Sequence, residues 1–497
     1  MTIDIPELSV VALIGASGSG KSTFARRHFL PTEVLSSDYF RGLVSDDEND
    51  QSATADAFEA LYYMLEKRLA RGKLAVIDAT NVRSDDRKRI LESAKKYHCF
   101  ACALVINTPE RVCHERNAAR PDRQFGPHVI HRQVADLKRG LRGLEREGFR
   151  YVHILDGGQD EVTIRRTPLW SDKRGETGPF DIIGDLHGCA DELRTLLTRM
   201  GWERYEISET ESPWGSEAWR HATGRKAVFV GDLVDRGPHV LETLRIVHNM
   251  AAAGHALCVP GNHDVKFMRW LRGKQVQVKH GLEVSITDVE HLSNDDRSKI
   301  AAFLDRLISH YVLDGGRLVV AHAGLREEMQ GRGSGAVREF CLYGETTGET
   351  DEFGLPVRYN WASEYRGKAT VVYGHTPVPE PEWLNNTVNV DTGAVFGGKL
   401  TALRYPEREF VSVPALREYA IPVRPFNPAK SDARSSQQLL DDVLDLEDVT
   451  GKRIIETRLY RNITIREENS IAALEVMTRF ATDPHWLIYL PDRKSVV

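Results

Sequence analysis

Residues Ser9–Ser22 read SVVALIGASGSGKS, and this stretch decides the fold of the first part of the chain. The apolar run Ser9–Ile14 predicts a buried strand, Gly15–Gly20 a loop and Lys21–Phe29 a helix. Further apolar runs alternate with helical patterns, which is typical of a parallel sheet with helices on both faces. These runs are Val34–Leu35, Leu74–Ile77, Ala101–Ile106 and Tyr151–Leu155. We therefore predict an α/β domain with a parallel sheet in residues 1–170.

The glycine-rich loop matches the P-loop pattern G-x-x-x-x-G-K-[ST] in full between Gly15 and Ser22. Backbone N–H groups of such a loop and the following helix N-terminus bind phosphates. Lys21 brings a charge to the same phosphates, and Ser22 can bind Mg²⁺. A glycine-rich turn that binds nothing is the weaker alternative, because the strand–loop–helix context is also present. We expect ATP and Mg²⁺ here and predict these nucleotide-binding residues: Gly15, Gly18, Gly20, Lys21, Ser22 and Thr23.

Three polar side chains near the next strands have two interpretations each. Asp38 follows the second strand, where it could accept the proton of an acceptor hydroxyl or cap the next helix. Arg41 could bind a phosphate or lie in solvent. Asp78 could support Mg²⁺ as a Walker-B carboxylate or cap the turn before Asn81. The spacing alone does not decide between the two roles of Asp38.

Basic residues are concentrated between Arg111 and Arg150, with ten Lys or Arg against five Asp or Glu. Arg116, Arg120 and Arg123 flank the turn at Pro121, and the first two share a helix face at i, i+4 spacing. A lid of this kind could place positive charge over transferring phosphates. A solvated basic helix is the alternative, and the P-loop in the same domain favours the lid.

A second domain is predicted after the polar segment Ser171–Pro179, SDKRGETGP. Strands are expected at Asp181–Gly184, Ala227–Gly231, Ala256–Pro260, Leu318–Ala321, Thr370–Tyr373 and Val388–Val390. Each of the first five leads into a loop bearing His, Asp or Asn, as in α/β sites built at strand ends. We predict that this domain covers residues 178–406.

Five short motifs carry the polar residues of this second domain in a fixed order. They are GDLHG at 184–188, GDLVDRG at 231–237, GNHD at 261–264, AHAG at 321–324 and GHTP at 374–377, and Asp391 ends the next strand. Two divalent ions about 3.5–4 Å apart can clamp a phosphate and activate water, and they need one bridging carboxylate with mixed N and O ligands. Five motifs at strand ends leave buried structural histidines as a weak alternative.

The ligands divide between two ions. Asp185 and His187 can serve one ion, and Asp232 can bridge. The other ion would take Asn262, His322 and His375. His263 can then protonate the leaving oxygen with Asp235 orienting it, while Arg236 binds phosphate oxygens. We expect Mn²⁺, with Ni²⁺ as the alternative, since such ligand sets accept several metals.

Composition limits the other classes of function. The chain has 497 residues and a net charge of −6, so any nucleic-acid contact must come from a local patch. Six cysteines favour reduced thiols and a cytoplasmic protein. Cys99 and Cys102 should face opposite sides of a strand, which argues against a shared site. We predict no signal peptide and no membrane span, because no apolar run is long enough.

With both sets of motifs in place, the sequence resembles the bacterial polynucleotide kinase-phosphatase family of RNA repair enzymes. The match covers essentially the whole chain, and the fusion of the two modules in this order is far more specific than either motif set alone. The resemblance implies a P-loop kinase that phosphorylates 5′-OH polynucleotide ends. It also implies a calcineurin-like α/β sandwich metallophosphoesterase that removes 2′-phosphate, 3′-phosphate or 2′,3′-cyclic phosphate from RNA ends.

The resemblance also assigns residues and partners. The kinase residues it implies, with Asp38 as the base, are Lys21, Ser22, Asp38, Arg116 and Arg123. The phosphatase residues it implies are Asp185, His187, Asp232, Arg236, Asn262, His263, His322, His375 and Asp391. RNA or DNA ends are the implied substrates, and an RNA 2′-O-methyltransferase is the family's partner. We expect a homo-oligomer without a membrane partner.

The amino-acid composition changes toward the end of the chain. Residues 407–438 contain Pro and Ser and are predicted to be a linker. Residues 439–497 form a short α+β segment, with a strand in ETRLYRNITI followed by an amphipathic helix. This segment resembles the incomplete start of the family's ligase-like adenylyltransferase module. No K-x-D-G motif is present, so we do not predict ligation.

Three rival functions stay open at this point. The first is a protein Ser/Thr phosphatase fused to a small-molecule P-loop kinase, because GDLVDRG and GNHD also occur in that class. The second is an RNA-binding module in which ATP only switches conformation, although a complete two-metal set argues against it. The third is a dinucleoside-polyphosphate hydrolase, which has no evident use for the P-loop domain.

Overall fold

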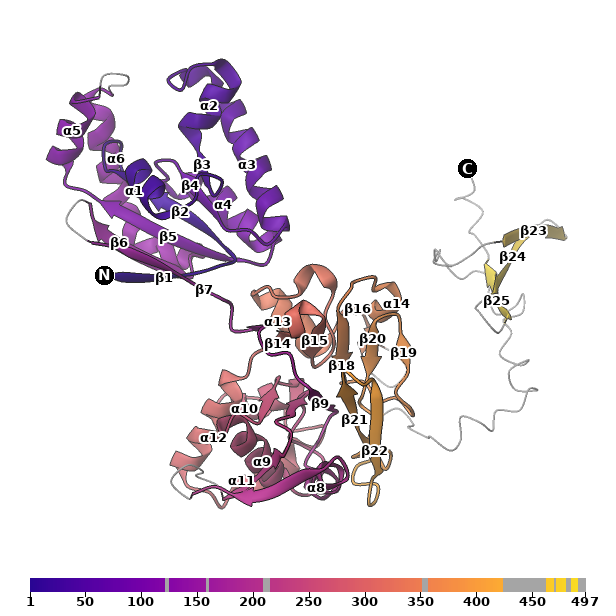
Figure 1. Cartoon of the computed structure of the whole chain (residues 1–497). Coiled ribbons are helices and arrows are strands. Elements are labelled where there is room, and N and C mark those ends of the chain that lie inside the picture. Colours follow the sequence, from indigo (N-terminus) through magenta and orange to yellow (C-terminus); the bar gives the residue numbers. More distant parts are fainter. Residues whose placement is uncertain are drawn as a thin grey trace. The chain divides into compact units, whose positions relative to one another are not determined.

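The computed structural model describes residues 1–120, 125–157, 161–208, 215–350, 356–422, 462–468, 471–479 and 484–489 (Figure 1). Met1–Phe426 form one compact unit, and Asn427–Val497 form a second. The first unit contains two sets of sheets, each with its own buried side chains. We call them the first body, residues 1–167, and the second body, residues 172–420.

The first body is built on a five-stranded sheet in which every neighbouring pair is parallel. In spatial order its strands are β3 (Val34–Ser36), β4 (Ala75–Asp78), β2 (Ser9–Ile14), β5 (Phe100–Asn107) and β6 (Tyr151–Asp156). All six residues of β2 are buried, as expected of a strand covered on both faces. The predicted parallel sheet is confirmed.

Alternate residues of the strands pack on opposite sides of this sheet. Val10 and Ala12 of β2 lie in one buried cluster, while Val11 and Leu13 lie in the other. Cys99 and Cys102 are likewise divided between the two clusters, so they face opposite sides of the sheet as predicted. The elements around the sheet are β1 (Thr2–Pro6), α1 (Lys21–His28), α2 (Ser37–Ser45), α3 (Thr54–Ala70), α4 (Ser84–Lys96), α5 (Glu110–Ala118), α6 (Pro127–Gly140), α7 (Leu144–Glu147) and β7 (Thr163–Thr167).

The second body contains two mixed sheets. The first has the order β13 (Ala256–Cys258), β12 (Lys226–Phe229), β9 (Phe180–Ile183), β21 (Lys399–Tyr405) and β22 (Glu409–Pro414). The second has the order β19 (Trp383–Leu384), β20 (Thr387–Asn389), β18 (Thr370–Tyr373), β15 (Leu318–Ala321), β14 (His310–Leu313) and β8 (Asp172–Lys173). The strands β9, β12 and β13 are mutually parallel neighbours, and so are β15, β18 and β20. The six strands predicted for this body are all present.

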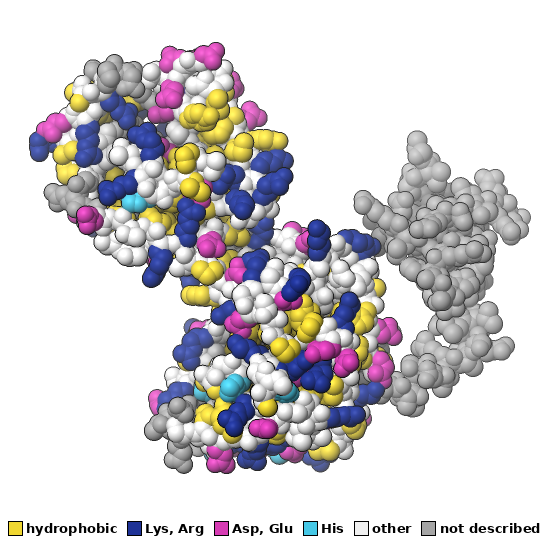
Figure 2. Space-filling model, viewed as in Figure 1, with side chains coloured by type: hydrophobic (Ala, Val, Ile, Leu, Met, Phe, Trp, Pro, Cys, Tyr) yellow, Lys and Arg dark blue, Asp and Glu magenta, His cyan; other side chains and the backbone are white. Residues whose placement is uncertain are grey.

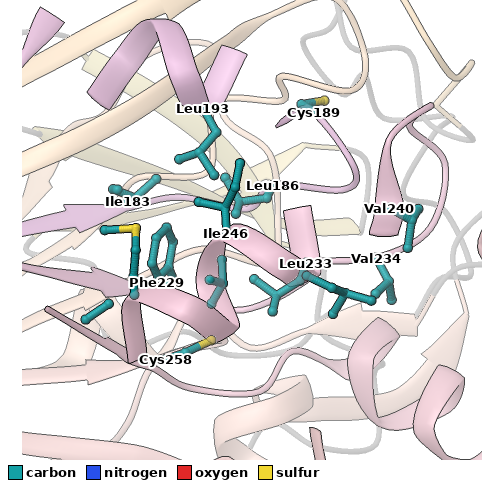
Figure 3. Close-up of a cluster of buried hydrophobic side chains, with 14 of the residues drawn as sticks. Ile183, Leu186, Cys189, Leu193, Phe229, Leu233, Val234, Val240, Ile246 and Cys258 are labelled. Carbon is teal, nitrogen blue, oxygen red and sulfur yellow. The ribbon is translucent and has the colours of Figure 1, made fainter. Parts of the chain in front are cut away.

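Apolar side chains from both sheets form the core between them. Ile182 and Val228 of the first sheet share a buried cluster with Val320 of the second. Their neighbours Ile183 and Phe229 point to the other side, into the cluster shown in Figure 3. Each fully buried side chain of this size contributes about 1.5–3 kcal/mol to folding. The helices of the second body are α8 (Ala190–Arg199), α9 (Val240–Ala252), α10 (Asn262–Leu271), α11 (Leu282–Val289), α12 (Asn294–Arg306), α13 (Gly335–Tyr343) and α14 (Trp361–Glu364).

Three features differ from the sequence prediction. The linker predicted for residues 407–438 begins too early, because Glu409–Pro414 pair with β21 as strand β22. Two hairpins were not predicted, β10–β11 (Trp202–Glu206, Glu217–His221) and β16–β17 (Thr346–Thr350, Pro356–Arg358), since their alternation is weak. The amphipathic helix predicted near the end is wrong over Ile471–Arg479. These residues form β24 between β23 (Asn462–Glu468) and β25 (Pro484–Tyr489), because the β-branched Val476 and Thr478 suit a strand.

The predicted linker from residue 423 to 438 lies outside the described residues. Within the described part of the chain, every helix is too short or too polar to cross a bilayer.

Candidate functional site

The P-loop lies at the carboxyl end of β2 and leads directly into α1. The Lys21 ammonium donates hydrogen bonds to the carbonyl oxygens of Gly15, at 2.8 Å, and Ala16, at 3.0 Å. Burial lowers the pKa of Lys21 to about 8, against an upward pull from Asp78. A cavity of about 310 Å³ opens beside the loop. Its lining includes Gly18, Gly20, Lys21, Ser22 and Thr23, all predicted to bind nucleotide.

Asp38, in the first turn of α2, lines the same cavity as Lys21. The helix α2 begins at Ser37, and its cap is Ser36, whose hydroxyl accepts from the Tyr39 N–H. The capping alternative for Asp38 is therefore wrong. Its carboxylate forms an ion pair with Arg41, which also donates to the carbonyl of Glu48 at 2.9 Å. Arg41 is buried and holds the carboxylate of Asp38 at the cavity wall.

Asp78 is the last residue of β4, next to the P-loop strand. Burial raises the pKa of its carboxyl group, while Lys21 and a hydrogen bond from Ser22 lower it. A carboxylate beside the Ser22 hydroxyl is the pair of oxygen donors that suits Mg²⁺ in a P-loop site. Asn81, after the turn that Asp78 could cap, donates its side-chain amide to the Leu13 carbonyl at 2.8 Å.

Of the three predicted lid arginines, one contacts the P-loop and one lines the nucleotide cavity. Arg116 of α5 donates to the carbonyl of Ser19 in the P-loop at 3.1 Å. Arg120 lines the cavity, but α5 ends at Ala118, so the two arginines do not share a helix face as predicted. Arg123 lies outside the described residues.

In the second body, the predicted ligands come together around the carboxylate of Asp232. Its Oδ2 lies 3.5 Å from Nε2 of His187 and 3.5 Å from Nε2 of His322. Its Oδ1 accepts a hydrogen bond from the His263 N–H at 3.0 Å. Two sets of potential metal ligands therefore share Asp232, which has the position of a bridging ligand. One set contains His187 and His263, and the other contains His322 and His375.

Backbone carbonyls fix the orientation of two of these histidines. Nδ1 of His187 donates to the Val234 carbonyl at 2.8 Å, and Nδ1 of His322 donates to the Val230 carbonyl at 2.9 Å. Each Nε2 therefore keeps a lone pair directed at the cluster. Nε2 of His322 also lies 3.0 Å from Nδ1 of His375 and 3.1 Å from Oδ1 of Asn262. Burial lowers the pKa of His322 to about 3, which keeps the ring neutral.

Asp185 and Asp391 add two more buried carboxylates. Oδ2 of Asp185 accepts from the His375 N–H at 3.1 Å, whereas its buried Oδ1 has no hydrogen-bond partner. Burial raises the pKa of Asp185 well above its ordinary value, and the charges of Asp391 and Asp232 raise it further. An unpaired buried oxygen among like charges is costly unless a cation compensates it. The cluster therefore fits a pair of divalent cations.

The backbone around the cluster is tightly constrained. A Cβ on Gly261 would lie 2.0 Å from Oδ1 of Asp232, and one on Gly374 would lie 2.0 Å from Oδ1 of Asp185. Five site residues also have positive φ angles: His187, Asp232, Asp235, Arg236 and His375. Non-glycine residues in this region cost about 1–3 kcal/mol each and are found at functional sites.

A second group of residues lies against the cluster. Arg236 donates to Nε2 of His187 at 2.6 Å and to Nε2 of His263 at 3.0 Å, so both rings are neutral. Nδ1 of His263 donates to Oδ2 of Asp235 at 2.6 Å. The predicted pairing of Asp235 with His263 is present.

Two residues at this site were missed in the sequence. The Ser285 hydroxyl donates to Oδ1 of Asp235 at 2.5 Å and accepts from the Asp235 N–H at 2.9 Å. Arg358, at the end of β17, bonds to Nε2 of His375 and donates to the Tyr343 carbonyl at 2.8 Å. Neither residue lies in a motif, and both reach the site only through long-range packing. Arg358 belongs to the β16–β17 hairpin, which was not predicted.

Comparison with known proteins matches each of the two bodies to a family. Residues 10–144 match the AAA domain family, and residues 178–402 match the calcineurin-like phosphoesterase family. A bis(5′-nucleosyl)-tetraphosphatase PrpE of Anoxybacillus flavithermus is 46% identical over 253 residues, which is 50% of this chain and 99% of the relative. The chain belongs to the calcineurin-like phosphoesterase family. A second PrpE, of Halalkalibacterium halodurans, is 46% identical over 48% of this chain and 94% of its own length.

Among solved structures, one described as a diadenosine tetraphosphatase is 25% identical, with a TM-score of 0.35 over 49% of this chain and 96% of that chain. A Ser/Thr phosphatase of Saccharomyces cerevisiae is 12% identical, with the same TM-score of 0.35, over 50% of this chain and 84% of that chain. The second body, 172–420, is hereafter the phosphoesterase body. Calcineurin-like phosphoesterases use divalent metals, and the Asp232 cluster provides candidate ligands for them.

Proposed function

We propose that the chain heals broken polynucleotide ends: the first body phosphorylates a 5′-OH end, and the phosphoesterase body removes a 2′-phosphate, 3′-phosphate or 2′,3′-cyclic phosphate. The observation that carries the proposal is that one cavity is lined by both Lys21 of the P-loop and Asp38. A phosphate donor and a hydroxyl acceptor can meet there. A P-loop ATPase without an acceptor would have no need of this carboxylate.

In the first body, each residue has a defined part in phosphoryl transfer. Asp38 accepts the proton of the attacking 5′-hydroxyl, and Arg41 keeps its carboxylate in place. Lys21 and Arg116 place positive charge where the transferring phosphoryl group develops negative charge. Ser22 and Asp78 would hold Mg²⁺, which supplies charge neutralisation on the phosphate chain when it is bound.

In the phosphoesterase body, the bound metals, proposed to be Mn²⁺, would supply Lewis-acid activation of the phosphate and of water. The ligands proposed for them are Asp185, His187, Asp232, Asn262, His322, His375 and Asp391. Arg236 neutralises phosphate oxygens next to the cluster. His263 transfers a proton from Nε2 to the leaving oxygen, and Asp235 stabilises its ring when it is protonated. Burial and Arg236 lower the pKa of His263, and a bound phosphate dianion acts in the opposite direction.

The test uses two substrates with separate readouts. A 5′-OH oligoribonucleotide with γ-labelled ATP and Mg²⁺ is expected to gain the label. A 3′-phosphate oligoribonucleotide with Mn²⁺ is expected to release inorganic phosphate. Label transfer only to small molecules, or phosphate release only from phosphopeptides, would favour the fusion of a small-molecule kinase and a protein phosphatase instead.

A second candidate for the phosphoesterase body is asymmetrical hydrolysis of bis(5′-nucleosyl) tetraphosphates. The observation that favours it is the 46% identity to PrpE proteins over nearly their whole length. Comparison of kcat/KM for diadenosine tetraphosphate with that for a 3′-phosphate oligoribonucleotide distinguishes the two. We expect the oligoribonucleotide to be the better substrate, because hydrolysis of a dinucleoside polyphosphate would not require the P-loop body.

A further inference from the structure

A basic side chain, Lys266, lies one helical turn beyond His263 in α10. His263 and Lys266 occupy positions i and i+3 of α10, so their side chains extend over the same face of the helix. Because His263 is proposed to protonate the leaving oxygen, we expect the leaving group to lie on the same face of α10 as this lysine.

The loop between α10 and α11 adds two more basic residues at the same place. The ammonium of Lys266 donates to the carbonyl of Lys279 at 2.7 Å. The N–H of Arg236 donates to the carbonyl of Gly281 at 3.2 Å. These two bonds fix the end of the loop that leads into α11, where Lys279 and His280 are exposed.

The charges at this place have predominantly one sign. Burial lowers the pKa of His280, and the positive charges of Lys266, Lys279 and Arg236 lower it further, whereas the charge of Glu283 raises it. Figure 2 shows histidine side chains at the surface of the phosphoesterase body with Lys and Arg side chains around them. Because the Asp232 cluster and Arg236 would take the scissile phosphate, the charges of Lys266 and Lys279 are available to a second anionic group.

We propose that Lys266, Lys279 and His280 form a subsite for a second phosphate of the substrate, on the leaving-group side of His263. In a polynucleotide with a 3′-terminal phosphate, this second phosphate is the one on the 5′ side of the terminal nucleoside. The proposal rests on the proposed function of the phosphoesterase body. It explains how the phosphoesterase body could select a polynucleotide end over a free nucleotide.

The experiment compares two substrates that differ only in this phosphate, uridine 3′-monophosphate and uridine 3′,5′-bisphosphate. The readout is release of the 3′-phosphate with saturating Mn²⁺, expressed as the ratio of the two kcat/KM values. We expect the wild type to prefer the bisphosphate by roughly tenfold, the effect of one or two partly exposed charge-assisted hydrogen bonds. The double variant Lys266→Ala/Lys279→Ala is expected to bring the ratio close to one. The control is Lys274→Ala, an exposed lysine of the same loop, which should keep the wild-type ratio.

Each other outcome overturns the subsite in a recognisable way. A wild type that hydrolyses the monophosphate equally well has no second-phosphate preference, and only the subsite fails. Equal losses on both substrates in the double variant, with the ratio unchanged, indicate a structural role for the lysines. A wild type that hydrolyses p-nitrophenyl phosphate but neither nucleotide contradicts both the subsite and the proposed function.

Discussion

At the scale of single residues, the phosphoesterase body depends on how the two oxygens of Asp232 are used. Oδ1 is held by a backbone N–H, and Oδ2 lies at equal distances of 3.5 Å from two histidine nitrogens. Nδ1 of each of these two histidines donates to a backbone carbonyl, which fixes the orientation of the ring toward Asp232. In the P-loop site, the ion pair with Arg41 likewise fixes the position of the Asp38 carboxylate at the cavity.

The pKa of Lys21 predicts how ATP binding depends on pH. Burial lowers this pKa to about 8 in the free protein, and bound phosphates raise it again because they favour the ammonium form. The affinity for ATP should therefore be constant below pH 8 and fall above it, by up to about tenfold per pH unit. Calorimetric Kd values between pH 7 and 9.5 check this. Lys21→Ala should bind more weakly at pH 7 and show no further fall, and a flat wild-type profile would argue against a charged Lys21 at the phosphates.

Ser285 is predicted to act through Asp235 and not on the substrate directly. Without its hydroxyl, Asp235 loses one donor and its N–H loses an acceptor, so His263 is less precisely oriented. Ser285→Ala should lower the kcat of phosphate release by about tenfold, the usual size of a supporting hydrogen bond at a metal site. KM should change little. The exposed Ser298 provides the matched control, and equal effects of Ser285→Ala and Ser298→Ala on kcat would contradict the assignment.

At the scale of elements, the candidate metal ligands are carried by the ends of neighbouring parallel strands. β9, β12 and β13 supply Asp185, Asp232 and Asn262 from one sheet, while β15, β18 and β20 lead to His322, His375 and Asp391 from the other. This arrangement brings residues from 185 to 391 into one cluster. A one-residue shift in any of these strands would turn its ligand away.

This arrangement also explains what could be predicted from the sequence. The ligands lie directly after apolar runs, so both the strands and the site were predictable from local patterns. Ser285 and Arg358 follow no such run, and their contacts depend on where α11 and the β16–β17 hairpin pack. The sequence could not decide whether Asp38 caps the helix, because that depends on its neighbour: Ser36 is the helix cap in the structure. The strand β22 was not predicted, because the Pro-containing sequence that follows it indicates a linker.

The close approach at Gly374 gives a test at this scale. Gly374 follows β18, and a Cβ there would lie 2.0 Å from Oδ1 of Asp185. Gly374→Ala should push this carboxylate out of place and lower phosphate release at least about 100-fold, as loss of a ligand does. Mn²⁺ bound per chain, measured by atomic absorption after gel filtration, should fall as well. Gly335→Ala is the control, since nothing lies within 4 Å of a Cβ there, and equal metal content in both variants would refute the steric argument.

At the scale of the whole molecule, the two bodies have separate buried clusters. The clusters around β2 contain residues of the first body, and those around β9 contain residues of the phosphoesterase body. Because neither core needs side chains from the other, we expect each body to unfold as its own cooperative unit. A ligand of one body should then stabilise that body selectively.

Differential scanning calorimetry tests this independence. A ligand at about 100 times its Kd adds about 2.7 kcal/mol, which raises the Tm of a body of this size by roughly 5–10 °C. Mn²⁺ should raise one transition, and an ATP analogue with Mg²⁺ should raise the other. Asp185→Ala should remove only the first shift and Lys21→Ala only the second. One transition that responds to both ligands would contradict separate units.

The most direct test of two independent sites in one chain is the healing of an RNA with a 5′-OH and a 3′-phosphate. Wild type, Lys21→Ala and Asp185→Ala are incubated with labelled ATP, Mg²⁺ and Mn²⁺, and both ends of the RNA are analysed on the same gel. We predict that the wild type converts both ends, that Lys21→Ala leaves only the 5′ end unphosphorylated, and that Asp185→Ala retains only the 3′-phosphate. Loss of both reactions in either variant, or no reaction at either RNA end by the wild type, would contradict it.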